Sequence, residues 1–256
     1  MNASSTPPLC LADDATFWPW RRWPEFSRWP NATATLVIVP LAGMADWGLG
    51  HALDAEETLL LSILRAASQT RPPSLPLLVT PPLRFVLGPD TGCAFAVEPP
   101  VAHALIAEVV ASIAASGFRR VVFFNASPWN EELIAAAARD LRIAHGLQLF
   151  RISLSGLGLD LHPARSTSRR KIQTLLTALT GRAPEPLPDS APPSDSRAWS
   201  DESVHPLLGL ADSFESAASE GAAILADAAA HLVSLLGEIH ARPPLAHGGV
   251  IPTAQP

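Results

Sequence analysis

Thr35-Leu-Val-Ile-Val-Pro-Leu41 is an unbroken run of apolar and mainly β-branched residues. A strand with one face in water alternates apolar and polar residues, whereas a strand buried on both faces is apolar throughout. The run therefore predicts a central strand of a parallel sheet with helices on both faces. Three further runs rich in apolar residues predict neighbouring strands, at residues 75–80, 119–125 and 147–153.

Helical patterns alternate with these strands, and this order is typical of a mainly parallel sheet with crossover helices, an α/β fold. In residues 54–68 four apolar side chains share one helical face, and Asp54 with Glu57 has the spacing of a capping box. Residues 83–98 are expected to be rich in loop. The remaining helices are expected at residues 101–116, 130–145, 166–180 and 215–240.

Composition narrows the class of protein. The 256 residues include 18 Lys and Arg against 24 Asp and Glu, which gives a net charge of −6. This acidic balance argues against a nucleic-acid partner, because binding one requires a basic face. With 48% hydrophobic and 16% charged residues it can bury a large core, so global disorder is excluded. It has no Gly-rich phosphate loop, so no nucleotide is expected.

Cysteine usage and the N-terminus indicate the compartment. Cys10 and Cys93 are too few for a disulfide framework or a cysteine-based zinc site. The first 19 residues lack the basic start and apolar run of a secretory signal. No stretch approaches the ~18 uninterrupted apolar residues of a transmembrane helix. We therefore expect a cytoplasmic protein with no membrane partner.

The chain divides into an arm, one domain and a tail. Residues 1–30 form the arm, whose four tryptophans stand among prolines that forbid a long helix. This arm either covers its own domain or, because Trp and Arg are enriched in interface hot spots, contacts another subunit. Residues 31–240 form the α/β domain, with a Pro-rich surface loop at 183–203, and residues 241–256 a loose tail.

The strand ends carry motifs of a known family. The end of the first strand reads Val39-Pro-Leu-Ala-Gly43, and Gly117-Phe-Arg-Arg-Val-Val122 leads into the third strand. Asn125-Ala-Ser-Pro-Trp-Asn130 stands at the end of the third strand, and Asp160-Leu-His-Pro-Ala-Arg-Ser-Thr-Ser168 leads into a helix. In order and spacing the chain resembles the creatininase family of metal-dependent amidohydrolases. The resemblance implies a single creatininase-like α/β domain, assembly into an oligomer, and hydrolysis of C–N bonds with two divalent cations such as zinc or manganese.

The metal-ligand positions that the resemblance implies are largely changed. Ala45 and Trp47 stand where the family has Glu and His, and Ser127 and Trp129 stand at the second motif. The glutamates of the last motif are replaced by one of Ala164, Arg165 or Ser166. Alanine and indole offer no lone pairs to a cation, and a neutral serine is a weak ligand. Since both tryptophans replace ligands that converge, we expect them to pack together.

Several candidate site residues remain. His162 matches the family's catalytic histidine, with Asp160 two residues before it; the plainer alternative is a hydrogen-bonding histidine beside a proline turn. A triad of Ser127, His162 and Asp160 is the other catalytic hypothesis, although Pro128 removes an oxyanion donor. Asp54, after a gap of about two residues, with His51 is the candidate metal pair if a metal is retained.

Glutamates at the helix starts have a simpler interpretation. Glu56, Glu57, Glu131 and Glu132 are expected to be solvated first-turn residues favoured by the helix dipole.

The sequence therefore supports two functions. The first is a creatininase-family pseudoenzyme without a cofactor, acting as a binding or accessory subunit in a homo-oligomer or hetero-oligomer, with a small-molecule ligand in the old cleft. The second is a metal-dependent hydrolase of a cyclic amide, formamide or peptide bond with a remodelled site. In the second, His162 is the acid/base and Asp54 with His51 holds zinc or manganese.

Overall fold

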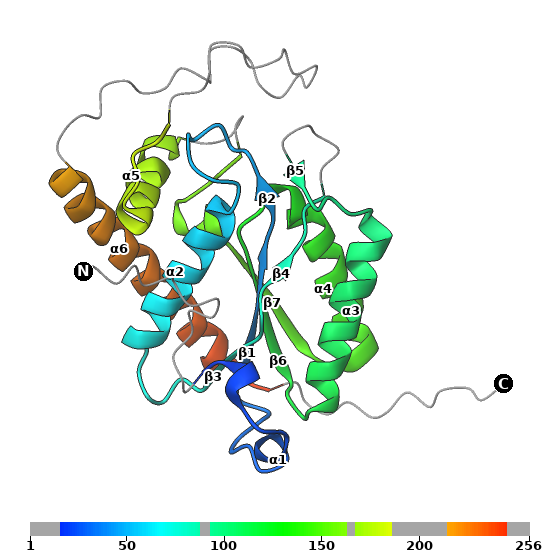
Figure 1. The fold of residues 1–256 in the computed structure, drawn as a ribbon. Helices are drawn as coiled ribbons and strands as arrows, with labels where there is room; N and C mark the ends of the chain where they lie inside the picture. Colours follow the sequence, from blue (N-terminus) through cyan, green and yellow to red (C-terminus); the bar gives the residue numbers. More distant parts are fainter. Residues whose placement is uncertain (1–15, 88–92, 163–166, 186–213, 245–256) are drawn as a thin grey trace.

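The structure, a computed structural model, describes residues 16–87, 93–162, 167–185 and 214–244. A mainly parallel sheet lies between two layers of helices (Figure 1). Its strands are β1 (Leu36–Ala42), β3 (Leu77–Val79), β4 (Leu83–Arg84), β6 (Arg120–Asn125) and β7 (Gln148–Ser153). The order is β3-β1-β6-β7, with β4 also paired to β1, and every pairing is parallel. The predicted fold class is confirmed.

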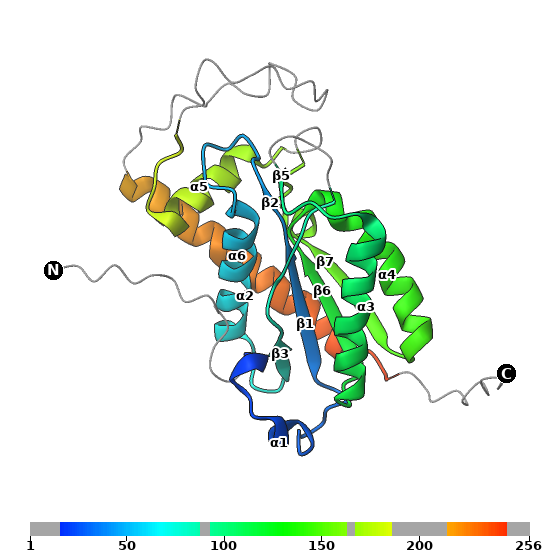
Figure 2. The ribbon, with the colours of Figure 1, turned by 45° about the vertical axis from the view of Figure 1, so that its right-hand side comes forward.

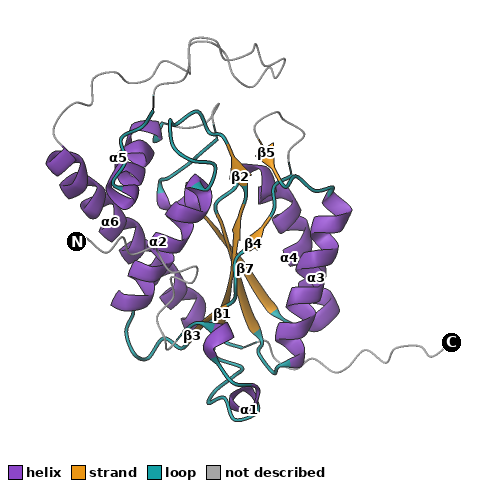
Figure 3. Ribbon diagram, viewed as in Figure 1, coloured by secondary structure: helices purple, strands orange, loops and turns teal. Residues whose placement is uncertain are grey.

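Helices cover both faces of the sheet, as Figures 2 and 3 show. On one face lie α3 (Pro99–Ala115) and α4 (Glu131–His145). On the other lie α2 (Ala55–Thr70), α5 (Arg169–Thr180) and α6 (Phe214–Ala241). The shorter elements are η1 (Trp18–Trp20), α1 (Trp23–Phe26), η2 (Pro128–Asn130) and η3 (Leu154–Leu157).

The central strand divides its side chains between two cores. All seven residues of β1 are buried. Leu36 and Ile38 face the α2–α5–α6 side, whereas Val37, Val39 and Leu41 face the α3–α4 side. Alternate residues of a strand point to opposite faces, so burial on both sides requires the unbroken apolar run seen in the sequence.

Helix α6 is long and apolar enough over Ala217–Ala241 to pass a length and composition test for a membrane span. Its inner side chains, including Ile224, Leu232, Leu236 and Ile239, belong to the core against the sheet. These contacts are those of the core helix of an α/β domain.

Some local expectations need correction. The loop-rich residues 83–98 also hold two short strands, β4 and β5 (Cys93–Ala94), and β5 pairs with β2 (Met44–Ala45). The capping box at Asp54 does not form, because Asp54 makes no side-chain cap bond and Glu57 pairs with Arg84 instead. Most of the predicted Pro-rich loop, from residue 186, and of the tail, from residue 245, lies outside the described residues.

The start of the tail is held rather than loose. The buried guanidinium of Arg120 donates hydrogen bonds to the carbonyls of His240 and Arg242, both at 2.7 Å. Gln148 Nε2 donates to the carbonyl of Pro243 at 2.8 Å. The His240 carbonyl is in the last turn of α6, where carbonyls have no partner within the helix, and the other two lie just after α6.

Candidate functional site

The candidate site lies where β1 and β6 end. In open parallel sheets, ligands bind at the carboxyl ends of the strands. Here β1 continues through Gly43 into β2 and the turn before α2, and β6 continues into Ala126 and η2. The first turn of α2 reaches the same place, and its Glu56 lies at the centre of the site.

Glu56 is a fully buried carboxyl group held by two donors. Its exposed fraction is 0%. The Gly43 amide donates to Oε2 at 2.5 Å, and the Trp47 indole Nε1 donates to Oε1 at 3.1 Å. The expectation that Glu56 is a solvated first-turn residue is therefore wrong. Its position on the inner face of α2 directs the side chain towards β1 rather than into water.

The electrostatics of Glu56 are dominated by burial. Removal from water penalises the charged form and raises the pKa of Glu56 from 4.5 to about 7. Hydrogen bonds from Gly43 and Trp47, and the nearby Ser127 hydroxyl, oppose part of this rise. Among the described residues no ion pair to Glu56 is present. Near neutral pH this carboxyl group is therefore divided between its protonated and ionised forms.

Gly43 is required by the close approach of its neighbours. A Cβ at this position would lie 2.9 Å from Val86 Cβ and 3.2 Å from Glu56 Oε2. Both distances are shorter than ordinary van der Waals contact. The glycine therefore allows the backbone between β1 and β2 to present its amide directly to the carboxyl group.

Two tryptophans fill the space beside Glu56. The rings of Trp47 and Trp129 are stacked, with centroids 5.9 Å apart and an angle of 16° between their planes. The prediction that they pack together is confirmed. Trp47 is 4% exposed, and Trp129 is half-buried with its ring 5.5 Å from that of His162. Indoles thus occupy two of the positions for which the sequence resemblance implied metal ligands.

Helix α5 holds the turn that carries Trp47. Arg169 donates from its guanidinium to the carbonyls of Trp47, at 3.3 Å, and Gly48. Gln173 Nε2 donates to the carbonyl of Leu49 at 3.1 Å. Partial burial lowers the pKa of Arg169, and the charge of Asp46 opposes this. An arginine remains charged under such a shift, so it stays a full hydrogen-bond donor to the turn.

The residues proposed for catalysis lie around Glu56 and the two stacked tryptophans. Asp160 Oδ1 accepts a hydrogen bond from the backbone N–H of His162 at 2.9 Å, and His162 contacts Trp129. Ser127 is 0% exposed; its hydroxyl influences Glu56 but makes no hydrogen bond of ordinary geometry within the described residues. The roles of His162, Asp160 and Ser127 stay predictions.

The candidate metal pair lies at the turn before α2. His51 is half-buried, its Nε2 has no hydrogen-bond partner among the described residues, and burial lowers its pKa. Its imidazole is therefore neutral at neutral pH. Asp54 is exposed and is the N-cap residue of α2.

The donors of the site do not fit a dinuclear metal centre. Within the described ranges, no group of three or more His, Cys, Asp and Glu side chains is placed to hold a metal ion. Two divalent cations need several carboxylates and imidazoles to replace their hydration water and offset their charge. The indole N–H of Trp47 and the amide of Gly43 already take lone pairs of the buried Glu56 carboxyl group.

This layered α/β domain, with its candidate site at the strand ends, has the fold of creatininases. The family model for creatininase, described as creatinine amidohydrolase, matches residues 21–180. The chain therefore belongs to the creatininase family. No curated protein matches it significantly.

Solved structures agree in fold. A crystal structure of creatinine amidohydrolase has a TM-score of 0.63 at 16% identity, covering 90% of this chain and 100% of that one. A mutant creatininase complexed with creatine has a TM-score of 0.61 at 17% identity, covering 89% and 100%. A structure described as creatininase Mn has a TM-score of 0.61 at 18% identity, again covering 89% and 100%.

Sequence reasoning missed Glu56, although a signal was present. Asp54 reaches the family's bridging carboxylate position only after a gap of about two residues. No gap is needed if Glu56, two residues further on, takes that position. Together with its burial, this makes Glu56 the better match to the bridging carboxylate.

Proposed function

We propose that this chain is a non-catalytic member of the creatininase family that acts as a binding or accessory subunit. The observation that carries the proposal is the environment of Glu56. Its two oxygens accept hydrogen bonds from Gly43 and Trp47, and the Trp47–Trp129 stack lies beside it. In this arrangement a tryptophan N–H stands where a cation would have to bind.

Proton competition adds to this argument. A cation binds the ionised carboxylate, and a pKa of about 7 leaves a large fraction of Glu56 protonated at neutral pH. To bind a metal ion there, the protein would have to lose a proton and break the Trp47 hydrogen bond. Ala45 supplies no compensating ligand, because its side chain is a methyl group.

One observation favours the alternative, a remodelled metal-dependent amidohydrolase. His51 Nε2 is shielded and without a hydrogen bond among the described residues, and its lowered pKa keeps the imidazole in the neutral form that binds cations. In this alternative His51 and Asp54 hold one zinc or manganese ion, and His162 moves a proton during cleavage of a C–N bond.

Metal content separates the two functions. We expect less than one zinc or manganese ion per ten chains after dialysis against both metals, measured by elemental analysis of the purified protein. We also expect no hydrolysis of creatinine, a formamide or a peptide amide above the buffer rate. Two bound ions per chain, or metal-dependent hydrolysis, would refute the proposal. One ion lost on His51→Ala would favour the alternative.

A variant that restores the family's ligand residues tests whether their replacement explains the loss of metal binding. Ala45→Glu, Trp47→His and Ser127→His together return the residue types that the family resemblance implies. If loss of donors is the cause, the triple variant gains zinc that the wild-type protein does not hold. Trp23→His, at a tryptophan that is 77% exposed and outside the site, is the control for adding a histidine.

A further inference from the structure

The turn between β2 and α2, which carries Trp47, is hydrogen-bonded along its length by one neighbouring segment. Four consecutive backbone carbonyls, those of residues 47–50, each accept a hydrogen bond from α5 or from the chain just after it. The donors are the Arg169 guanidinium, the Gln173 side chain and the Glu185 backbone N–H. We call these three residues the α5 clamp.

The last bond of the α5 clamp depends on a glycine. Glu185 N donates to the Gly50 carbonyl at 2.8 Å, and Gly50 has a φ of +69°. A Cβ at position 50 would lie 2.9 Å from Glu185 N and 3.0 Å from Pro184 Cβ. Both the backbone angle and this close approach favour a residue without a side chain. Position 50 is therefore adapted to a segment that lies directly against the turn.

Helix α5 is itself fixed to the core, so the clamp has a rigid support. Its inner side chains belong to the core cluster on the α2–α5–α6 side of the sheet, namely Ile172, Leu175 and Leu176. Gln173 is buried as well, and its Nε2 donates to the Leu49 carbonyl at 3.1 Å. Such a contact resists separation, because the donor would otherwise be left unpaired in the protein interior.

The clamp determines where the indole of Trp47 lies. This indole donates to Glu56 Oε1 at 3.1 Å and stacks on Trp129. Arg169 binds the carbonyls of Trp47 and of the next residue, so it fixes the backbone from which the indole extends. A guanidinium is suited to this role, because its planar fork of donors can bond two neighbouring carbonyls at once and stays charged when partly buried.

We propose that Arg169 is a positioning residue: through the α5 clamp it holds the Trp47 indole on Glu56 and so keeps the site closed. The inference rests on the proposed function, because in a site without bound cations the protein's own groups must fix this turn. Arg169 brings a positive charge and two directed donors to the turn, and the Asp46 carboxylate is the neighbouring negative charge. When the clamp is broken, the turn opens locally and the Glu56 carboxyl group becomes accessible to water.

Hydrogen exchange of the indole N–H groups, followed by NMR of isotope-labelled protein in heavy water, tests the proposal. The chain has seven tryptophans, and Trp47→Phe identifies the signal of Trp47. We expect Arg169→Gln to speed exchange of this signal at least about tenfold, while the four tryptophans of the arm change much less. Arg169→Lys should restore part of the protection, because an ammonium group keeps the charge but lacks the planar fork. If Arg169→Gln does not fold, Gln173→Ala removes one bond of the same clamp and should speed exchange of the same signal by a smaller factor.

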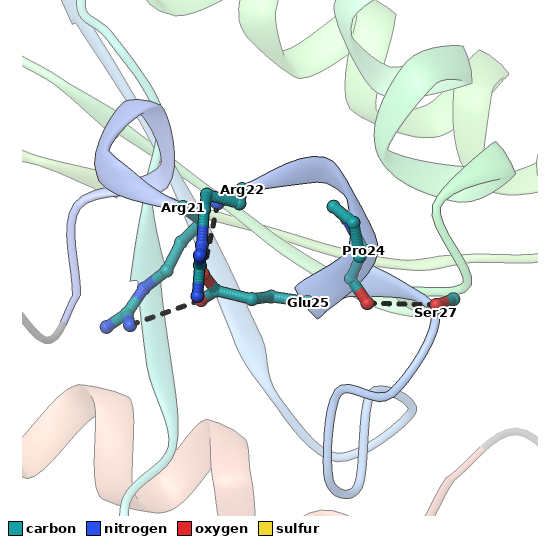
Figure 4. A network of polar contacts seen from close by, with 5 residues as sticks. All are labelled: Arg21, Arg22, Pro24, Glu25 and Ser27. Carbon is teal, nitrogen blue, oxygen red and sulfur yellow. Dashed lines mark hydrogen bonds and ion pairs between the residues drawn. The ribbon is translucent and has the colours of Figure 1, made fainter.

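Two arginines outside the site are the matched controls. Arg119 also donates to two backbone carbonyls, those of Ala114 and Phe118, both at 2.9 Å. Arg22 pairs with Glu25 at 3.2 Å in the arm, as Figure 4 shows. Neither Arg119→Gln nor Arg22→Gln should act selectively on the signal from the turn.

Two results would overturn the proposal. One is unchanged exchange at Trp47 in the clamp variants, and the other is an equal rise at every indole, as a general loss of stability would produce. Metal bound to the wild-type protein would instead overturn the proposed function, so the two failures are distinguishable.

Discussion

The buried carboxyl group of Glu56 makes the stability of the protein depend on pH in a defined direction. Its pKa is about 7 in the folded protein, against 4.5 for an exposed glutamate. Below pH 4.5 the group is protonated in both the folded and the unfolded chain. Between pH 4.5 and about 7 the unfolded chain releases its proton while the folded chain keeps it, so the free energy of unfolding falls as pH rises. Above this range the loss is complete.

The size of this effect follows from the shift in pKa. One pKa unit corresponds to about 1.4 kcal/mol, so a change from 4.5 to about 7 amounts to roughly 3 kcal/mol. No discount for exposure is needed, because the side chain is 0% exposed. Against a typical total stability of about 5–15 kcal/mol, a change of this size is readily measured.

Glu56→Gln isolates the contribution, because the amide has nearly the same shape and does not titrate. Urea unfolding followed by tryptophan fluorescence at several pH values between 4.5 and 8 gives the free energy of unfolding of both proteins. We expect the wild-type protein to lose about 3 kcal/mol relative to the variant across this range. Glu132→Gln, an exposed first-turn residue of α4, is the control for the change in net charge. A constant difference between wild type and Glu56→Gln would refute the buried-carboxyl argument.

Three further changes are expected to lower stability, each measured by urea unfolding at a fixed pH. Gly43→Ala should cost about 1–3 kcal/mol, because its Cβ would lie 2.9 Å from Val86 Cβ; an unchanged midpoint would mean that β1 can shift freely. Trp47→Phe removes the indole donor at 3.1 Å and should cost about 1–3 kcal/mol while raising the pKa of Glu56 further. Arg120→Met removes two hydrogen bonds to the carbonyls of His240 and Arg242 and should lower the free energy of unfolding by about 1–3 kcal/mol. The protection of the α6 amides against hydrogen exchange should fall in the same variant.

The arrangement of layers could be predicted from the sequence because it follows from local pattern. A strand that is apolar on both faces, such as residues 35–41, requires a helix layer on each side. The family resemblance then supplied the position of the site, and the convergence of Trp47 and Trp129 followed from their shared ligand positions. The layers depend on residue order and periodicity, whereas the site position and the convergence of the tryptophans depend on the family resemblance.

The state of individual polar groups was decided only by tertiary packing. Glu56 and Glu57 are adjacent acidic residues in the first turn of one helix, yet one is buried beneath Gly43 and the other pairs with Arg84 at the surface. No local pattern separates them, because the difference depends on which way α2 is rotated against β1. The arm is similar: its sequence predicts aromatic contacts, but only the fold determines that Phe26 turns inward and Trp23 outward. Whether a residue is buried depends on neighbours that folding brings from distant parts of the chain. The local sequence pattern does not say which residues those neighbours are.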